Sequence, residues 1–229
     1  MKLSIIIPVY NEQATIAEVL RRVGAVEIPD VVKEVIVVDD GSTDGTAAVL
    51  AGAHDCLVIR HPRNRGKGAA VRSGLSRATG EWVIIQDADL EYDPADYVAI
   101  MAAARVTGAE AVYGSRLLGR RWREAKKSGW LFFFGGLFLT ALTNLLYQTT
   151  LTDEPTGYKC FRREVLLSLP LRADDFAFCP EVTAQLARAG KKIVEVPISY
   201  TPRTKAQGKK INWRDGLIAI WTLFKYRFY

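Results

Sequence analysis

The sequence predicts an α/β fold with a mostly parallel, Rossmann-like central sheet flanked by helices. Short β-like runs alternate with amphipathic helical patterns through the first half of the chain, which is typical of βαβ units. The β-like runs are almost wholly apolar instead of alternating, as expected for strands covered on both faces. With 229 residues the chain can bury a full core, and we expect one domain.

The first half of the chain supplies the expected parallel strands and their crossover helices. Five strands are expected, at Leu3–Val9, Glu34–Val38, Cys56–Ile59, Trp82–Gln86 and Ala111–Tyr113. Helical periodicity between them predicts four helices, near Ala14–Val23, Thr46–Ala51, Ala69–Ala78 and Ala95–Ala104.

After Gly114 the alternation lapses. We expect a basic loop, an apolar helix, a polar turn, a second helix, a short β run and an amphipathic tail, at Arg116–Ser128, Trp130–Tyr147, Thr149–Gly157, Pro180–Ala189, Lys192–Val196 and Asn212–Tyr229. In the tail, apolar and aromatic residues recur at helical spacing with basic residues off that stripe. This pattern suits either docking on the protein's own core or an interfacial helix on an anionic membrane.

The net charge of +6 is unevenly distributed. Arg116–Ser128 holds six basic residues against one acid, and Tyr200–Tyr229 holds seven against one. These segments together carry +11, so the rest of the chain carries −5. Local basic charge indicates anionic partners at particular surfaces, and no nucleic-acid partner is expected.

Cysteine usage and the N-terminus favour a cytoplasmic location. Cys56, Cys160 and Cys179 have no metal-ligand spacing, and their odd number leaves one unpaired in any disulfide scheme, so a reducing compartment is the simplest interpretation. The apolar start is interrupted at Pro8, too early for a signal peptide. Trp130–Tyr147 is uncharged over nearly a bilayer span, but its polar residues and Gly135-Gly136 favour a core or interfacial helix.

Two acids, Asp39 and Asp40, follow the second expected strand. In open α/β sheets ligands bind beyond the carboxyl ends of the strands, and a carboxylate there can accept from the edge of a base or from ribose hydroxyls. Turn and capping chemistry explains Ser42, Thr43 and Asp44 well. It does not explain two adjacent acids at a buried strand end.

The Asp-x-Asp after the fourth expected strand is a candidate metal site. In an extended chain Asp87 and Asp89 point the same way, so both carboxylates can converge on Mg²⁺ or Mn²⁺. Such an ion would neutralise a diphosphate and act as a Lewis acid for its departure. The alternative is a solvated acidic loop, and Asp93 is expected to cap the helix that begins at Pro94.

Two common phosphate motifs are incomplete. Arg65-Gly66-Lys67-Gly68 matches part of a P-loop, but His61 stands where its first glycine should be. The first strand is not followed by G-x-G-x-x-G, which disfavours a dinucleotide-binding domain.

Five segments, taken together and in this order, carry a resemblance to a known family. They are Pro8–Glu12 (PVYNE), Val38–Thr46 (VDDGSTDGT), Asn64–Gly68 (NRGKG), Asp87–Glu91 (DADLE) and Gly114–Arg116 (GSR). The set resembles the inverting glycosyltransferases of family 2, and within it the dolichyl-phosphate mannosyltransferase-like branch. The resemblance implies a GT-A fold and a metal-dependent hexosyltransferase that uses a GDP- or UDP-hexose donor.

The resemblance also implies roles for individual residues. The nucleoside would be surrounded by Pro8, Tyr10, Glu12, Val38 and Asp40. Sugar and metal would be held by Asp87, Ala88 and Asp89, with Glu91 as a further metal ligand, and Arg116 would contact the sugar diphosphate. The expected catalytic set is Asp87, Asp89 and Arg116. Arg203 would close over the diphosphate with a following lysine, Lys209 or Lys210.

The expected acceptor is a polyprenyl phosphate, dolichyl or undecaprenyl. Its phosphate oxygen is already anionic, so attack needs steering more than a base, and the basic run would supply it through Arg120, Arg121, Arg123, Lys126 and Lys127. The alternative acceptor is a glycan hydroxyl, which needs a base, and Asp153 and Glu154 are the candidates.

These expectations divide the single domain into two parts. Residues 1–116 would form the nucleotide-sugar half and residues 117–229 the acceptor half with the interfacial helices. Since the sequence ends soon after this catalytic unit, it resembles the family members without appended transmembrane helices. We therefore expect a peripheral protein on the inner face of the membrane.

Overall fold

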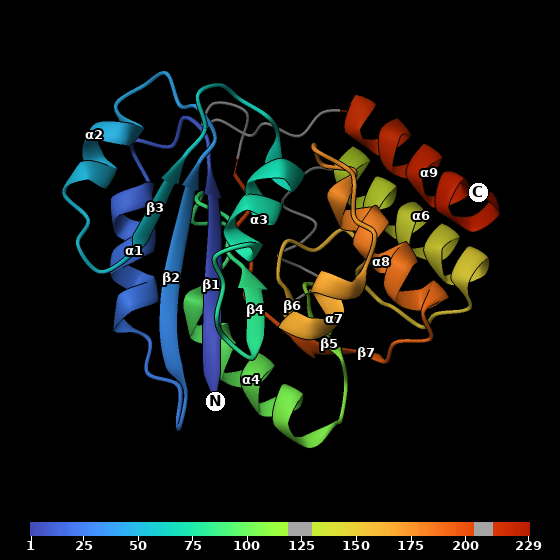
Figure 1. The fold of residues 1–229 in the computed structure, drawn as a ribbon. Helices are drawn as coiled ribbons and strands as arrows, with labels where there is room; N and C mark the ends of the chain where they lie inside the picture. The colour runs from blue at the N-terminus through green and yellow to red at the C-terminus, as the bar shows by residue number, and fades with distance from the viewer. Residues whose placement is uncertain (119–129, 204–212) are drawn as a thin grey trace.

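A computed structural model describes residues 1–118, 130–203 and 213–229. It contains a seven-stranded sheet in the order β3-β2-β1-β4-β6-β5-β7 (Figure 1). The strands are β1 (Lys2–Val9), β2 (Val32–Asp39), β3 (Leu57–Arg60), β4 (Trp82–Ile85), β5 (Ala111–Ser115), β6 (Lys159–Arg162) and β7 (Ile193–Pro197). All pair in parallel except β6, which is antiparallel to β4 and β5. The expected mostly parallel α/β sheet is confirmed.

Helices cover both faces of this sheet. They are α1 (Ile16–Ala25), α2 (Thr46–Ala51), α3 (Lys67–Leu75), α4 (Tyr97–Val106), α6 (Trp130–Tyr147), α7 (Arg163–Ser168), α8 (Phe178–Arg188) and α9 (Trp213–Phe228), with a short 3-10 turn η1 at Pro94–Asp96. Each expected helix is present, with ends displaced by a few residues.

The strands pack on both faces, as their apolar composition predicts. Along β1, Leu3, Ile5 and Ile7 belong to one core cluster, which includes residues of α1 and α4. Between them, Ile6 belongs to a second cluster, which includes residues of α3, α7 and α8. Alternate side chains of β1 therefore pack into apolar cores on opposite faces of the sheet, and the strand is buried on both sides.

The strand β6 is the main element that was not expected. Its four residues, Lys159 to Arg162, include two basic side chains, so the segment lacks the apolar run of a buried strand. It forms because it lies between β4 and β5 and completes both hydrogen-bonded ladders. The side chain of Lys159 is nevertheless buried and has a buried partner, described below.

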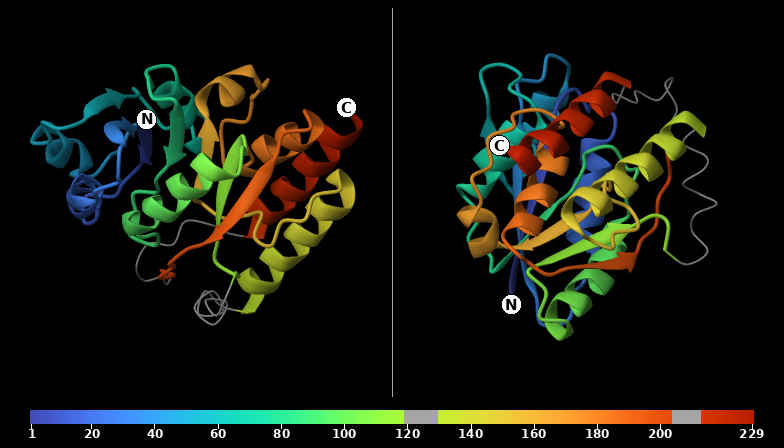
Figure 2. Two further views of the ribbon diagram at one scale, coloured as in Figure 1. Left: turned by 90° about the horizontal axis from the view of Figure 1, so that it is seen from below. Right: turned by 90° about the vertical axis from the view of Figure 1, so that its right-hand side faces the viewer.

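Helices α6 and α9 lie side by side next to α8 (Figures 1 and 2). They pack on one another through a small cluster of Leu139, Ala219 and Leu223. No helix within the three described ranges combines the length and the apolar character needed to cross a bilayer. The proposed boundary between two functional halves at residues 116 and 117 stays a prediction.

Candidate functional site

The candidate site lies where β1, β2, β4 and β5 end. Parallel pairing aligns Val9 of β1 with Asp39 of β2, and β4 pairs with β1 on its other side. The residues that follow these strands therefore share one edge of the sheet, as expected for a doubly wound fold.

Gln86 fixes the start of the acidic turn. Its buried side-chain Oε1 accepts hydrogen bonds from the hydroxyls of Tyr97 (2.5 Å) and Tyr158 (2.6 Å), and its Nε2 donates to the carbonyl of Asp87 at 2.9 Å. Leu90 has φ of 63°, a left-handed conformation that turns the chain sharply. The turn is thus held in one shape by buried polar contacts.

Asp87 is paired with a lysine that sequence analysis did not single out. Lys67, at the start of α3, places Nζ 2.5 Å from Asp87 Oδ1. On the other side, a Cβ added to Gly157 would lie 2.4 Å from Asp87 Oδ2. A glycine is therefore needed for the loop before β6 to approach this carboxylate.

Asp89 lies in a crowded electrostatic environment. Burial, followed by the neighbouring charges of Asp87 and Glu91, raises the pKa of Asp89 to about 7. Like charges this close favour either a proton or a cation. A hard divalent ion beside Asp89 would relieve that repulsion, and carboxylate oxygens are suitable ligands for it, so the Asp89 carboxylate is chemically suited to a metal.

The three-carboxylate ligand set stays a prediction. Within the described residues, no group of three or more His, Cys, Asp or Glu side chains is placed to hold a metal ion together. Asp87 is held by Lys67, and Glu91 accepts hydrogen bonds from the Arg203 amide at 2.6 Å and the Tyr200 hydroxyl at 3.2 Å. Asp89 Oδ1 likewise accepts from the Glu91 amide at 3.1 Å.

Arg203 reaches the site from the far end of the chain. Its Nε donates to the Asp89 carbonyl at 2.6 Å, and its two Nη atoms lie 3.1 and 2.8 Å from the Glu12 carboxylate. The segment after β7 is thereby fixed to both the acidic turn and the loop after β1. The structure thus brings Glu12, Asp89, Glu91 and Arg203 together, and the roles expected for them stay predictions.

Asp39 and Asp40 have different surroundings although both are buried. The Asp40 carboxylate accepts from the amides of Arg65 and Gly66, at 2.9 and 2.7 Å, and lies 2.6 Å from His61 Nδ1. It therefore organises the loop before α3. Asp39 Oδ1 accepts from the Ser42 amide.

Asp39 Oδ2 is a buried acceptor that lacks a hydrogen-bond donor in the described chain. It lies 3.3 Å from Arg60 Nε, close enough for attraction but without a hydrogen bond. Buried polar atoms are nearly always hydrogen-bonded, so this oxygen is suited to accept from a ligand.

The remaining residues of the expected nucleotide-sugar site differ in access. Pro8 and Tyr10 are partly exposed at the end of β1. Val38 is fully buried in the core on the α3 side of the sheet, so a ligand could contact its main chain but not its side chain. Ala88 is also buried. The roles expected for these four residues stay predictions.

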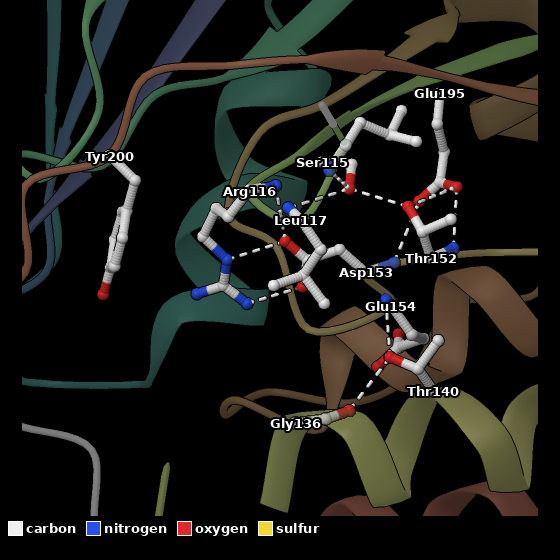
Figure 3. Close-up of polar contacts among 12 residues, drawn as sticks. Ser115, Arg116, Leu117, Gly136, Thr140, Thr152, Asp153, Glu154, Glu195 and Tyr200 are labelled. Carbon is white, nitrogen blue, oxygen red and sulfur yellow. Dashed lines mark hydrogen bonds and ion pairs between the residues drawn. The ribbon is translucent and has the colours of Figure 1, made fainter. Parts of the chain in front are cut away.

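Arg116 is held by Asp153 (Figure 3). Its Nε and Nη2 each lie 2.7 Å from a different Asp153 oxygen, and its amide donates to Oδ2 at 2.8 Å. The guanidinium also lies 5.1 Å from the centre of the Tyr200 ring. Burial alone would lower the pKa of Arg116, but the charge and hydrogen bonds of Asp153 together with Tyr92 and Tyr200 outweigh it and the pKa is raised.

Asp153 and Glu154, the candidate bases for a hydroxyl acceptor, both have structural partners. Asp153 forms a bidentate ion pair with Arg116. Glu154 is fully buried, 3.1 Å from the Nζ of the buried Lys159. Neither carboxylate is placed to meet an acceptor at the surface, which disfavours the base role considered for them.

Two groups of expected residues lie outside the described parts of the chain. They are the diphosphate-closing Lys209 and Lys210, and the basic run Arg120, Arg121, Arg123, Lys126 and Lys127. Their roles stay predictions.

The site also contains residues that sequence analysis missed or discounted. Lys67 belongs to a segment considered as an incomplete P-loop, and the structure uses it as the partner of Asp87. His61 was noted only as a mismatch to that motif, yet it is buried against Asp40. A basic residue opening a glycine-flanked helix was the available signal for Lys67. For His61 there was none.

Comparisons with known proteins agree with this geometry. A match to the family described as Glycosyl transferase family 2 extends over residues 4–169. The chain is 30% identical over 215 residues to the undecaprenyl-phosphate 4-deoxy-4-formamido-L-arabinose transferase of Sodalis glossinidius, covering 91% of this chain and 62% of that protein. It is 28% identical to the dolichol-phosphate mannosyltransferase of Pyrococcus furiosus, covering 91% and 59%. The chain thus spans about three-fifths of these relatives' length.

Solved structures show the same fold. A glucosyl-3-phosphoglycerate synthase from Mycobacterium tuberculosis, in complex with Mn²⁺, UDP and phosphoglyceric acid, superposes with a TM-score of 0.73 at 23% identity. The match covers 99% of this chain and 78% of that one. The GT-A fold is therefore confirmed. With the acidic turn at the end of β4 and a family match over most of its length, this chain belongs to glycosyl transferase family 2.

Proposed function

We propose that this protein transfers a hexose, with inversion, from a GDP- or UDP-sugar to a polyprenyl phosphate at a membrane surface. One observation carries the proposal beyond the family. Along the chain, α6 begins shortly after Arg116 and α9 shortly after Arg203, and Thr140 of α6 accepts from the Glu154 amide, next to the Asp153 that holds Arg116. An apolar surface next to a phosphate-handling site suits an acceptor with an anionic head and a lipid tail.

The exposed faces of these helices support a membrane role. On α6 the exposed residues Trp130, Phe134, Phe138 and Leu145 follow helical spacing, and α9 repeats the same spacing with Trp213, Leu217, Trp221 and Phe228. Each is more than half exposed. Exposed aromatic stripes of this size mark interaction surfaces.

Basic residues on α9 specify the kind of surface. Arg214, Lys225 and Arg227 accompany the aromatic stripe against one acid, Asp215. Aromatic residues with nearby cations are typical of helices that lie at an anionic bilayer interface. We propose peripheral attachment to the inner face of the membrane, with the bilayer as the occupant of this face.

The donor half of the proposal rests on the ends of β1, β2 and β4. Asp39 Oδ2, buried and lacking a donor in the described chain, could accept from an N–H of the base or from a ribose hydroxyl. Lys67 holds Asp87 so that its other oxygen can orient the sugar. Mg²⁺ or Mn²⁺ bound by Asp89 would neutralise the diphosphate and assist its departure.

The acceptor phosphate needs steering more than activation. Its anionic oxygen forms a bond to the anomeric carbon while the bond from that carbon to the nucleoside diphosphate breaks, which inverts the configuration. No proton has to be removed from the attacking oxygen. The engagement of Asp153 and Glu154 with cations supports this acceptor over a glycan hydroxyl, which would require a base.

A direct assay tests the proposal. The purified protein is incubated with Mn²⁺ or Mg²⁺ and a panel of GDP- and UDP-sugars, with undecaprenyl phosphate, dolichyl phosphate, 3-phosphoglycerate or a soluble glycan as acceptor. We expect a glycosyl phospholipid. Transfer to a soluble acceptor, with none to either lipid phosphate, would reject the acceptor class.

Membrane attachment is tested separately by sedimentation with vesicles. Wild-type protein should bind vesicles containing phosphatidylglycerol, and high salt should weaken the binding. The double variant Trp213→Ser/Trp221→Ser should lose most of it, whereas Val106→Ser, at an exposed apolar residue on α4, should not. Equal binding to neutral vesicles by all three proteins would contradict the interface assigned here.

A further inference from the structure

Glu195, on β7, was not part of any expected site. Its carboxylate accepts three hydrogen bonds from the loop before β6 (Figure 3). The donors are the Thr152 amide (2.7 Å) and the Thr152 hydroxyl (2.9 Å), both to Oε2, and the Asp153 amide (3.0 Å), to Oε1. Both oxygens are thus directed at two consecutive residues.

The donor and acceptor of each hydrogen bond between Glu195, Thr152 and Ser115 can be assigned, because each hydroxyl has one proton to donate. Glu195 Oε2 accepts from the Thr152 hydroxyl, so the single proton of that hydroxyl points to Glu195. Ser115 Oγ, 2.7 Å from the Thr152 oxygen, must then donate to it. The Ser115 oxygen in turn accepts from the amides of Leu117 and Leu118 at 3.2 Å. One directed chain therefore runs from Glu195 to the turn that carries Arg116.

A second connection reaches the Arg116 side chain. Glu195 holds the amide of Asp153, and the Asp153 carboxylate holds the amide, Nε and Nη2 of Arg116. On the far side, the adjacent Glu154 amide donates to Thr140 of α6 at 3.0 Å. Arg116 is thus fixed through its main chain and its side chain, and both routes converge on Glu195.

We propose that Glu195 is a positioning residue for Arg116, acting through Thr152 and Asp153 to set where the guanidinium meets the donor diphosphate. The inference rests on the proposed function for the role of Arg116. The supporting geometry is specific, because a carboxylate accepts with both oxygens whereas an amide of the same shape must offer N–H₂ at one of them. A glutamine at 195 would therefore set a donor against either the Thr152 or the Asp153 amide.

The main test compares Glu195→Gln with Glu110→Gln. Glu110 is a matched control, since it also accepts from a main-chain amide near β7, that of Lys192 at 2.8 Å. It precedes β5, whereas Arg116 follows the other end of that strand. In the lipid-phosphate assay we expect Glu195→Gln to lower kcat about ten- to a hundredfold, as small misplacements of reacting groups do. The donor KM should change less than threefold. Glu110→Gln should stay within twofold of wild type.

A double-mutant cycle separates positioning from general damage. If Glu195 acts through Arg116, then Glu195→Gln should change kcat less than twofold in an Arg116→Ala background. Equal losses in both backgrounds, or an equal loss in Glu110→Gln, would overturn the proposal. Should Glu195→Gln fail to fold, Thr152→Val carries the same test, since it removes the hydroxyl connection alone.

Hydrogen exchange tests the link without any turnover. In Glu195→Gln the amides of Arg116 and Asp153 should exchange about tenfold faster than in wild type, while those of β1 stay unchanged. Unchanged exchange at Arg116 would overturn the proposal. If wild type transfers no sugar to lipid phosphate, the proposed function fails, and exchange alone still decides whether Glu195 positions Arg116.

Discussion

Replacing Lys159 by methionine should lower the free energy of unfolding by several kcal/mol. Lys159 Nζ lies 3.1 Å from Glu154 Oε1, 3.0 Å from Thr183 Oγ1 and 3.3 Å from the Cys179 carbonyl, and it lies 4.5 Å from the Tyr113 ring centre. Burial alone would lower the pKa of Lys159, but Glu154 and the other neighbouring groups together outweigh it and the pKa is raised. Lys159 is therefore charged in the folded protein.

The magnitude follows from what the substitution leaves behind. Glu154 is fully buried, and its Oε2 already lacks a hydrogen-bond partner within the described chain. Breaking a buried ion pair on one side costs about 3–5 kcal/mol. For a chain of this length the unfolding entropy is about 0.5 kcal/mol per degree, so the Tm should fall by about 6–10 °C.

The double variant Glu154→Gln/Lys159→Met should regain about 2 kcal/mol or more, because the uncompensated charge is gone. Urea and thermal unfolding, followed by circular dichroism, measure both effects. A loss below about 1 kcal/mol in the single variant, or no recovery in the double, would refute this reasoning. The double variant should also keep its transferase activity within a few fold, whereas loss of a true base costs about a hundredfold or more.

Three further predictions concern the metal ligand, two glycines and one carboxylate of the sheet. Asp89→Asn should abolish metal-dependent turnover and weaken Mn²⁺ binding measured by calorimetry while leaving the Tm nearly unchanged; retained turnover would reject Asp89 as a ligand. Gly157→Ala should lower activity, because its Cβ would lie 2.4 Å from Asp87 Oδ2, whereas Gly135→Ala, with open space around it, should stabilise α6 by up to about 1 kcal/mol. Burial would raise the pKa of Glu34, but hydrogen bonds from Lys2, Ser4 and Thr79 lower it to about 2. The stabilisation that Glu34 contributes is thus full above its unfolded pKa and is lost as the pH falls from about 4.5 to 2. Urea unfolding should show that the wild-type free energy of unfolding falls by about 1–2 kcal/mol more over this range than that of Glu34→Gln.

Local sequence patterns were sufficient to predict the first half of the fold. The apolar runs and crossover helices of residues 2–115 are short-range signals, and each appears where periodicity placed it. The strand β6 was missed because its register depends on β4 and β5, and a segment with Lys159 and Arg162 carries no local β signal. Long-range pairing decided that element.

The candidate site could likewise be predicted from the sequence only in part. The acids of the turn after β4 and Arg116 belong to motifs that follow strand ends, whereas Arg203 was indicated only by the family resemblance. The residues that form ion pairs with them could not be predicted from the sequence. Lys67 meets Asp87 across 20 residues, and Arg203 meets Glu12 across 191, so only the folded chain shows which charges neutralise one another. Asp153 and Glu154 were considered as bases because burial and ion pairing cannot be read from spacing.

Transfer of sugar to lipid phosphate tests the central claim most directly. Purified protein, Mn²⁺, radiolabelled GDP-mannose or UDP-glucose and undecaprenyl phosphate are incubated in anionic vesicles, and the organic phase is counted beside an Asp89→Asn control. We predict a glycosyl phospholipid that forms with wild type and not with the control. Label found in the aqueous phase on 3-phosphoglycerate or a glycan when these are supplied instead, with none in the lipid from any donor, would contradict the account.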